Sequence, residues 1–294
     1  MLEELRWKTS VSATCLHAAA CRAAGLPAAD AQLAAALDPA ADALMSEIVA
    51  AGWPVTEMLH ELTGLASELD NNGELVRRAI TRLHLPMAEV TAPVRVAGAI
   101  SDLEAAMLRA HPELVEELAV RVRPIREQWE ARGPGMLIEI ARLTDPIVVP
   151  SAAEIVLVAP YAGGGGEAHA RVNRVTFEAV LFNPLPALPE AVRLAWLLCQ
   201  LYADLPWLSD VLPPRRCASA MKLAMIPPVL AAAEAVELAR CDEASVAAAL
   251  AAWQPAANAT VATPQLWSWW NAWLDQSTKW PVAVAALDQM LPRT

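Results

Sequence analysis

The stretch from Glu154 to Leu201 limits the fold of this chain more than any other, because only there does the residue pattern become strand-like. It opens with an apolar run at Glu154–Val158. After four consecutive glycines, apolar and polar residues alternate over Arg174–Phe182. Such patterns are typical of short β-strands, whereas most of the remaining chain carries apolar residues at helical spacing. We therefore expect a mainly α-helical α+β protein, with helices packed on a small β-sheet at about residues 147–182.

Two regions are expected along the chain: a helical N-terminal region over residues 1–96, and a mainly helical domain over residues 97–294 that contains the sheet. In the first region, Pro54 can start a helix in which apolar residues recur at helical spacing as far as Leu69. Residues 86–96 lack this periodicity and contain Pro93. They are therefore the expected connector between the two regions.

The middle of the chain reads as a helical region with breaks. It begins at Ser101, which stands in a capping-box sequence. We expect Pro112 and Pro124 to divide or kink it, because proline lacks a backbone N–H and clashes with the preceding turn. Gly133-Pro134-Gly135 is expected to end it, and a further short helix is expected over Met136–Leu143.

The composition indicates a globular, acidic protein. Hydrophobic residues make up 56% of the chain and charged residues only 19%, so a large core can form. The formal net charge of −11 disfavours nucleic acid and anionic membrane surfaces, because binding to either depends on clustered Lys and Arg. We expect neither as a partner.

The cysteines and the N-terminus favour a reducing compartment. The five cysteines are scattered without CxxC spacing, and an odd number argues for free thiols. The N-terminus is acidic before any apolar run, unlike a secretory signal. The longest charge-free window, residues 244–274, is interrupted by Pro255, Asn258 and Pro264. We therefore expect a cytoplasmic protein without a transmembrane helix.

The helix expected over Pro189–Asp204 is apolar around most of its circumference. At helical spacing, four polar side chains fall within a narrow arc: Glu190, Arg193, Gln200 and Asp204. This polar stripe could face a cleft or solvent. Alternatively, Glu190 and Arg193 could pair with each other at i, i+3.

The order of strand, glycine loop, strand, proline turn and buried helix, whose second half reads VTFEAVLFNPLPALPEAVRLAWLLCQL, resembles the core of zincin metallopeptidases. In that family, an HExxH helix after an edge strand supplies two histidine zinc ligands and a glutamate base. Here the helix reads Arg193-Leu194-Ala195-Trp196-Leu197, so both ligands and the base are missing. The resemblance therefore implies an inactive relative, without zinc or peptidase activity at this helix.

The four glycines could form a nest of backbone N–H groups that binds an anion, because glycine allows positive φ and close approach. A dinucleotide site is not expected, since a strand rather than a crossover helix follows the loop, and no GK[ST] sequence marks a P-loop. The loop is therefore either a flexible connector or a ligand-binding loop. In the second case, the ligand-binding residues would be Gly163, Gly164, Gly165, Gly166, His169, Arg171 and Arg193.

We predict no catalytic residue, metal ligand or cofactor from the remaining histidines and cysteines. His60 and Glu61 are expected to be a solvated pair on the polar face of their helix, and the residue four positions after His60 is Gly64 rather than His. Cys15 and His17 are close in sequence but point to different faces of a helix.

A tryptophan-rich segment near the C-terminus has two interpretations. Trp269 or Trp270, with Leu266, Trp273 and Leu274, forms a stripe that would face the core and leave Trp267 turned away. Alternatively, the segment is an exposed aromatic patch that docks a partner, with Trp267 and Trp270 as the partner-binding residues.

These patterns favour a non-catalytic binding or interaction protein, which could be a degenerate zincin-like fold. One alternative is an anion- or nucleotide-binding enzyme that uses the Gly163–Gly166 loop. The other is a partner-docking protein that uses the tryptophan-rich segment. The expected partner is accordingly a protein or a small anion. The sequence indicates neither which one nor the oligomeric state.

Overall fold

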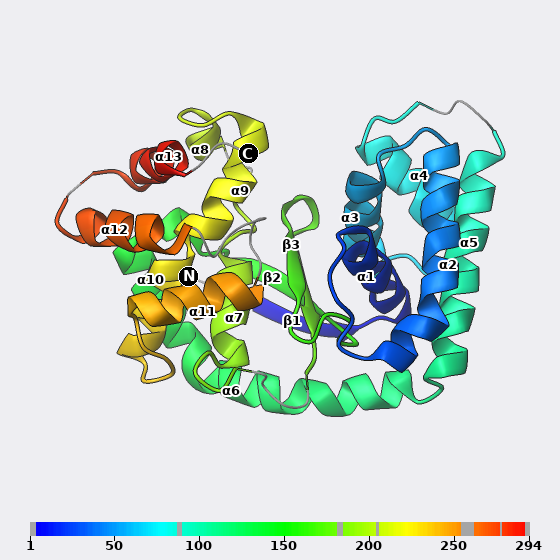
Figure 1. The fold of residues 1–294 in the computed structure, drawn as a ribbon, viewed down its shortest axis with the longest axis horizontal. Helices are drawn as coiled ribbons and strands as arrows, with labels where there is room; N and C mark the ends of the chain where they lie inside the picture. Colours follow the sequence, from blue (N-terminus) through cyan, green and yellow to red (C-terminus); the bar gives the residue numbers. More distant parts are fainter. Residues whose placement is uncertain are drawn as a thin grey trace. The chain divides into compact units, whose positions relative to one another are not determined.

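The computed structural model describes residues 4–86, 90–180, 185–203, 206–253, 262–276 and 278–291. The chain divides into two compact units, each described below by itself. We call residues 6–123 with 154–182 the sheet unit, and residues 1–5, 124–153 and 183–294 the helical unit. Figure 1 shows the helices and strands of both units, coloured in the order of the sequence. The mainly helical α+β class predicted from the sequence is confirmed.

The β-sheet has four strands in the order β1-β2-β4-β3. They are β1 (Glu4–Thr9), β2 (Ala152–Val158), β3 (Gly166–His169) and β4 (Arg174–Glu178). β2 pairs with β4 in parallel, whereas β3 pairs with β4 antiparallel and forms an edge. Both predicted strands are present, but the second ends at Glu178: Ala179 and Val180 are not in a strand, and Leu181 and Phe182 lie outside the described residues. The sequence did not indicate β1 or β3, which begins at the last of the four glycines.

All five residues of β4 are buried, including the polar side chains of Arg174, Thr176 and Glu178. Their alternation with Val175 and Phe177 is the pattern of a strand with one face in water. In the structure both faces are covered, so the polar side chains must find partners inside the protein.

Among its described residues, five helices lie wholly within the sheet unit. They are α1 (Val11–Ala23), α2 (Ala31–Ala50), α3 (Val55–Leu65), α4 (Asn72–Arg82) and α5 (Ala92–Ala110). The side chains of Ser10, Asp30 and Asn71 cap α1, α2 and α4 by accepting hydrogen bonds from backbone N–H groups of the first turn. α2 packs along α5, and α1 packs against α2, α3 and α5 (Figure 1). The apolar stripe predicted after Pro54 lies in α3, where Met58, Leu59 and Leu62 are fully buried.

The grouping of the chain differs from the predicted division at residue 96. α5 runs through that position without a break, and Pro93 lies in its first turn, where the missing N–H has no helical partner to lose. The sheet unit also includes the distant segment 154–182. That segment joins the unit through strand pairing, which a reading of local composition does not detect.

Helix α6 (Leu114–Leu143) is continuous through both of its prolines. The helix is therefore not divided at Pro124, and the end expected at Gly133-Pro134-Gly135 is wrong. The division expected at Pro112 is confirmed, because α5 ends at Ala110 and α6 begins at Leu114. Packing explains part of the difference, because the helix buries a row of large side chains that continues past both sites: Leu118, Ile125, Trp129, Met136 and Ile140. At Gly133, the Trp129 ring occupies the space that a Cβ would need, so glycine is required there for packing.

The helical unit contains the C-terminal helices. They are α7 (Glu190–Leu198), α8 (Pro206–Ser209), α9 (Pro214–Ala224), α10 (Ile226–Ala235), α11 (Glu243–Trp253), α12 (Thr263–Leu274) and α13 (Trp280–Met290). α10 packs against α7, α9, α11 and α12, which places it at the centre of this unit. Two 3₁₀ turns, η1 (Pro146–Val148) and η2 (Ala170–Val172), precede β2 and β4 respectively.

One helical stretch among the described residues, Arg216–Ala235, has the length and composition of a membrane span. It consists of α9 and α10, which meet at Met225. Within the structure 72% of the apolar window is buried, as in a core helix of a soluble protein. The stretch therefore gives little support for a membrane span.

The tryptophan-rich segment packs mostly inside the helical unit. Leu266, Trp269 and Trp270 of α12 are buried, and Trp269 contacts the ring of Trp280 at a centroid distance of 5.6 Å. Trp267 and Trp273 are half-buried. The expectation that Leu274 faces the core is wrong, because its side chain is 54% exposed.

We expect Trp270→Ala to lower the free energy of unfolding by about 3–5 kcal/mol, because it removes a fully buried indole and leaves a cavity. Trp267→Ala is the matched control on the same helix and should cost clearly less, since its side chain is only half-buried. Urea unfolding followed by far-ultraviolet circular dichroism measures both values. Equal losses for the two variants would contradict this packing.

Candidate functional site

Helix α1 places two reactive side chains on one face. His17 and Cys21 stand four positions apart, so they lie one above the other on the helix, and both are buried. The Cys21 Sγ lies 3.4 Å from the His17 Nε2. This face of α1 therefore presents a nitrogen and a sulfur side by side inside the sheet unit.

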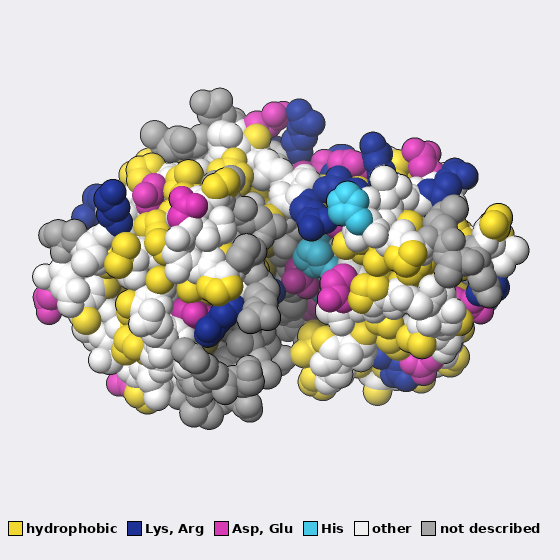
Figure 2. All heavy atoms as spheres, turned by 90° about the horizontal axis from the view of Figure 1, so that it is seen from above, with side chains coloured by type: hydrophobic (Ala, Val, Ile, Leu, Met, Phe, Trp, Pro, Cys, Tyr) yellow, Lys and Arg dark blue, Asp and Glu magenta, His cyan; other side chains and the backbone are white. Residues whose placement is uncertain are grey.

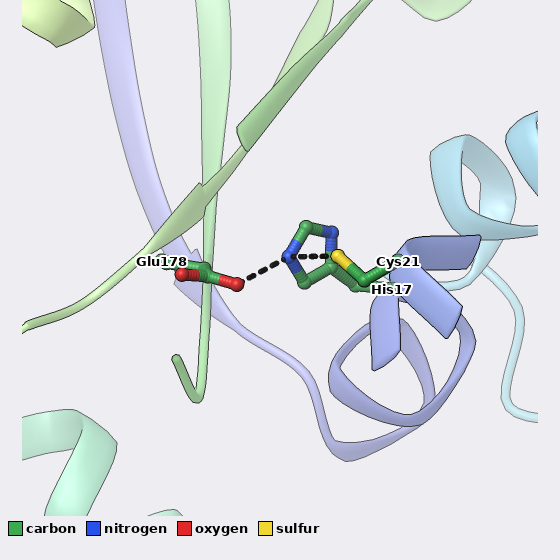
Figure 3. A group of neighbouring side chains, drawn as sticks. All are labelled: His17, Cys21 and Glu178. Atoms are coloured by element: carbon green, nitrogen blue, oxygen red, sulfur yellow. Dashed lines mark hydrogen bonds and ion pairs between the residues drawn. The ribbon is translucent and has the colours of Figure 1, made fainter. Parts of the chain in front are cut away.

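Glu178, at the end of β4, faces the same point. Its Oε1 lies 2.9 Å from the His17 Nε2, and its side chain is fully buried (Figure 3). Four backbone N–H groups of the loop after β2 also donate to this carboxylate. Tyr161 and Ala162 donate to Oε1 at 2.9 and 2.8 Å, and Gly164 and Gly165 donate to Oε2 at 2.6 and 2.7 Å.

The glycine loop therefore does bind an anion, and that anion is the side chain of Glu178. Gly163 and Gly164 have φ of +82° and +138°, which side-chain-bearing residues rarely adopt. A Cβ on Gly165 would lie 3.2 Å from the Glu178 carboxyl group. The glycines thus let successive N–H groups turn toward one carboxylate at close range.

The charges of this cluster follow from its surroundings. Burial by itself lowers the pKa of His17, but the adjacent Cys21 and Glu178 together raise it well above its ordinary value. Burial raises the pKa of Glu178, but His17 and the loop N–H groups hold it well below its ordinary value. His17 and Glu178 are therefore a buried imidazolium–carboxylate pair.

The arrangement is not that of a Cys-His-Glu catalytic triad. In a triad the two ring nitrogens have different partners, with the nucleophile at one and the orienting carboxylate at the other. Here the Cys21 Sγ and the Glu178 Oε1 both face the same atom, the His17 Nε2 (Figure 3). The cluster can hold the glycine loop in place, and its three atoms are also of the types that bind a transition metal.

A second buried charge lies at the other end of β4. The Arg174 guanidinium donates to Glu154 at 2.5 Å, to Glu68 at 2.7 Å and to the carbonyl oxygen of Gly64. Lys8 also pairs with Glu154 at 2.7 Å. Burial raises the pKa of Glu154, but Lys8 and Arg174 bring it below its ordinary value. Arg174 thus connects β2, β4 and the end of α3.

His169 is buried on β3 and electrically neutral. Its Nε2 lies 2.9 Å from the Thr176 hydroxyl, and its ring lies against that of His60 at a centroid distance of 4.5 Å. Gly64 makes room for it, since a Cβ there would lie 3.0 Å from the imidazole. Burial, with a smaller contribution from His60, lowers the pKa of His169 to about 3.

The structure distributes the predicted ligand-binding residues over separate places. In the sheet unit, the loop glycines lie at one end of β3 and His169 at the other. Arg171 is exposed and exchanges side chain-to-carbonyl hydrogen bonds with Arg82. Arg193 belongs to the helical unit, where it is 2% exposed and pairs with Glu190, as one of the two interpretations of the polar stripe predicted. The sheet unit therefore does not gather the glycines, His169 and Arg171 into one group.

The predicted docking residues also differ from each other. Trp270 is 1% exposed, so no partner can reach it in this structure, whereas Trp267 is half-buried.

The expectation that His60 and Glu61 are both solvated is wrong for Glu61. Glu61 is buried and forms an ion pair with Arg82, whereas His60 is partly exposed and lies near Glu167, with an Nδ1–Oε1 distance of 3.6 Å.

The sequence reading missed the cluster of His17, Cys21 and Glu178. A signal for its first half was present, because His17 and Cys21 stand at i, i+4 in a segment that reads as helical. The nearer pair, Cys15 and His17, does point to different faces of α1. Nothing local indicated Glu178, which is brought to α1 only by the tertiary structure.

Comparisons with protein-family models, with curated proteins and with solved structures found no match to this chain.

Glu178→Gln should destabilise the protein by about 3–5 kcal/mol, because it leaves His17 and the loop N–H groups without their buried counter-charge. The matched control is Glu167→Gln on neighbouring β3, whose side chain is 40% exposed, and it should change stability by about 0.5 kcal/mol or less. Urea titration at pH 7.5 compares the two. A Glu178→Gln variant as stable as the control would show that the carboxylate charge does not hold this loop.

The stability of the wild type should fall relative to His169→Gln as the pH decreases from 6.5 toward 3. Below about pH 6.5 His169 becomes protonated in the unfolded chain. It stays neutral in the folded chain, because burial lowers its pKa there to about 3. The difference should grow by up to about 1.4 kcal/mol per pH unit. Urea unfolding of both proteins at pH 8 and pH 5 measures it. An unchanged difference would mean that His169 titrates normally when folded.

Proposed function

We propose that this chain is a soluble, cytoplasmic, non-catalytic binding or interaction protein whose core derives from a zincin-like fold. The observation that carries the proposal is the state of Glu178. A general base or nucleophile needs an accessible carboxylate with a free lone pair. Glu178 is fully buried, and its oxygens already accept from four backbone N–H groups and face His17. Its role is therefore to shape the loop.

Helix α7 supports the non-catalytic reading. In the zincin resemblance it occupies the place of the metal-binding helix, but Arg193 and Leu197 stand at the two ligand positions. Arg193 is buried and ion-paired with Glu190 within the helical unit. A guanidinium stays protonated at all physiological pH values and has no lone pair for a metal. Residues at the ligand positions thus serve packing and charge pairing.

In the anion-binding alternative, an external anion would have to displace the Glu178 carboxylate from the loop N–H groups. The N–H groups of Gly164 and Gly165 that an external phosphate or carboxylate would use already donate to Glu178 at 2.6 and 2.7 Å. An external anion would also approach a buried negative charge. The loop is therefore better suited to an internal structural role than to holding a ligand.

The binding surface of such a protein remains on its exterior. Figure 2 shows acidic, basic and hydrophobic side chains interspersed on one face, as on most protein surfaces. In the tryptophan-rich segment, the side chains that a partner could reach are those of the half-buried Trp267 and Trp273 and the exposed Leu274, whereas Trp269 and Trp270 belong to the core. A protein partner accordingly fits better than a small anion.

Two assays on the purified chain test the proposal. A mixed fluorogenic peptide library, with and without added Zn²⁺, should show no hydrolysis above that of the Arg193→Ala variant. In a thermal-shift screen, phosphate, nucleotides and carboxylates should leave the melting temperature unchanged. Turnover that Glu178→Gln abolishes would contradict the proposal. So would an anion that stabilises the wild type but not Gly165→Ala, since that variant crowds the Glu178 carboxylate and the loop.

A further inference from the structure

We propose that His17, Cys21 and Glu178 form a binding site for one divalent cation of the zinc class, which takes the place of two protons, one on the His17 Nε2 and one on the Cys21 thiol. Among the described residues, these three form a group whose ligand atoms all lie within 4.8 Å of one another. The proposal goes beyond the proposed function, because it assigns a structural metal ion to a unit for which the sequence predicts none.

The first support is the direction of the imidazole nitrogen. The Nε2 of a histidine points one way in the ring plane, with either a single N–H or a single lone pair. Yet it has two close neighbours, the Glu178 Oε1 at 2.9 Å and the Cys21 Sγ at 3.4 Å. One proton cannot be well directed at both. A cation located between the three atoms would contact the lone pairs of the His17 Nε2 and the Cys21 Sγ, and the Glu178 Oε1 would bind it in addition to the N–H groups of Tyr161 and Ala162.

The distances fit this interpretation in part: one pair of ligand atoms is already at the separation that zinc requires, and the Cys21 Sγ and the Glu178 carboxylate oxygen lie within 4.8 Å of each other. Zinc binds histidine nitrogen at about 2.0–2.1 Å, thiolate sulfur at about 2.3 Å and carboxylate oxygen at about 2.0–2.2 Å. With tetrahedral angles, these bond lengths separate neighbouring ligand atoms by roughly 3.4–3.6 Å. The observed Cys21 Sγ–His17 Nε2 distance of 3.4 Å agrees with that range. The Glu178 Oε1–His17 Nε2 distance of 2.9 Å would have to increase by roughly half an ångström.

The ligand set selects the metal. A thiolate and an imidazole favour zinc-class ions over Mg²⁺ and Ca²⁺, which prefer oxygen ligands. A neutral imidazole, a thiolate and a carboxylate carry two negative charges, which a divalent ion neutralises inside the protein. The four loop N–H groups on Glu178 would then orient a metal ligand, as hydrogen bonds to ligating carboxylates commonly do.

Burial closes the site to substrates, and its three protein ligands are one fewer than the four of most structural zinc sites. His17 and Cys21 are each 5% exposed and Glu178 is not exposed at all, so a substrate could not reach an ion between them. The ion would connect α1 to the end of β4 and, through Glu178, to the glycine loop. Its expected effect is stabilisation of the folded sheet unit, since it binds a group of side chains that exists only after folding.

Cobalt(II) is the probe, because a thiolate bound to it gives a charge-transfer absorption band in the near ultraviolet. The protein is refolded without oxygen in the presence of Co²⁺, since the closed cluster would exclude ions added later. We expect one Co²⁺ per chain, the band, and a higher melting temperature than without metal. Cys21→Ser should lose the band. The matched control, Cys15→Ser, changes an equally buried cysteine on the same helix and should keep it.

The proposal is overturned if folded wild-type protein binds no Co²⁺, or if Cys21→Ser retains the full band. If Cys21→Ser does not fold, X-ray absorption at the zinc edge of the wild type replaces it. One sulfur among the ligands then supports the site and none refutes it. Failure here leaves the proposed non-catalytic function intact. Peptide hydrolysis would refute that function whether or not a metal binds.

Discussion

The structure of the sheet unit depends on the neutralisation of one buried carboxylate. Glu178 ends a strand that is covered on both faces, where an unpaired charge would cost several kcal/mol. The loop after β2 folds around it with four N–H groups, and His17 approaches from α1. A helix near the N-terminus, a loop and a strand more than a hundred residues later are thereby joined at one point. Losing the charge would release all three.

The same strand repeats this solution at its other end. Arg174 opens β4 and is held by Glu154, Glu68 and a backbone carbonyl, so positive and negative charges lie at opposite ends of one buried strand. Between them, Thr176 pairs with the neutral His169. The polar residues of β4 therefore connect the sheet to α1 and to the end of α3. This explains how a strand with an alternating sequence can lie entirely inside the protein.

These internal pairings bear directly on function. The groups that resemble catalytic machinery, namely a glutamate, two histidines, a cysteine and a glycine nest, are used by one another. A nest filled by its own carboxylate is rigid and preorganised, but it offers little to an external anion. In our proposal, the capacity that burial leaves to His17, Cys21 and Glu178 is to share a cation that they enclose as the unit folds.

The sequence by itself determined the fold class, the two main strands and the helix after Pro54, because hydrophobic periodicity and helix-start residues are local signals. It also indicated that the four glycines suit an anion, since that property belongs to the backbone. Only the tertiary structure decided which anion it is. Glu178 reads as the solvent-facing member of an alternating strand, and its burial depends on the covering of both sheet faces. Helix α6 likewise continues through Pro124 and Pro134 because packing along its length outweighs the local preference of proline. Of the group of His17, Cys21 and Glu178, the sequence showed only the first two residues, which stand at i, i+4 on α1. It was completed only by strand pairing, because pairing partners far apart in a sequence leave no local signal.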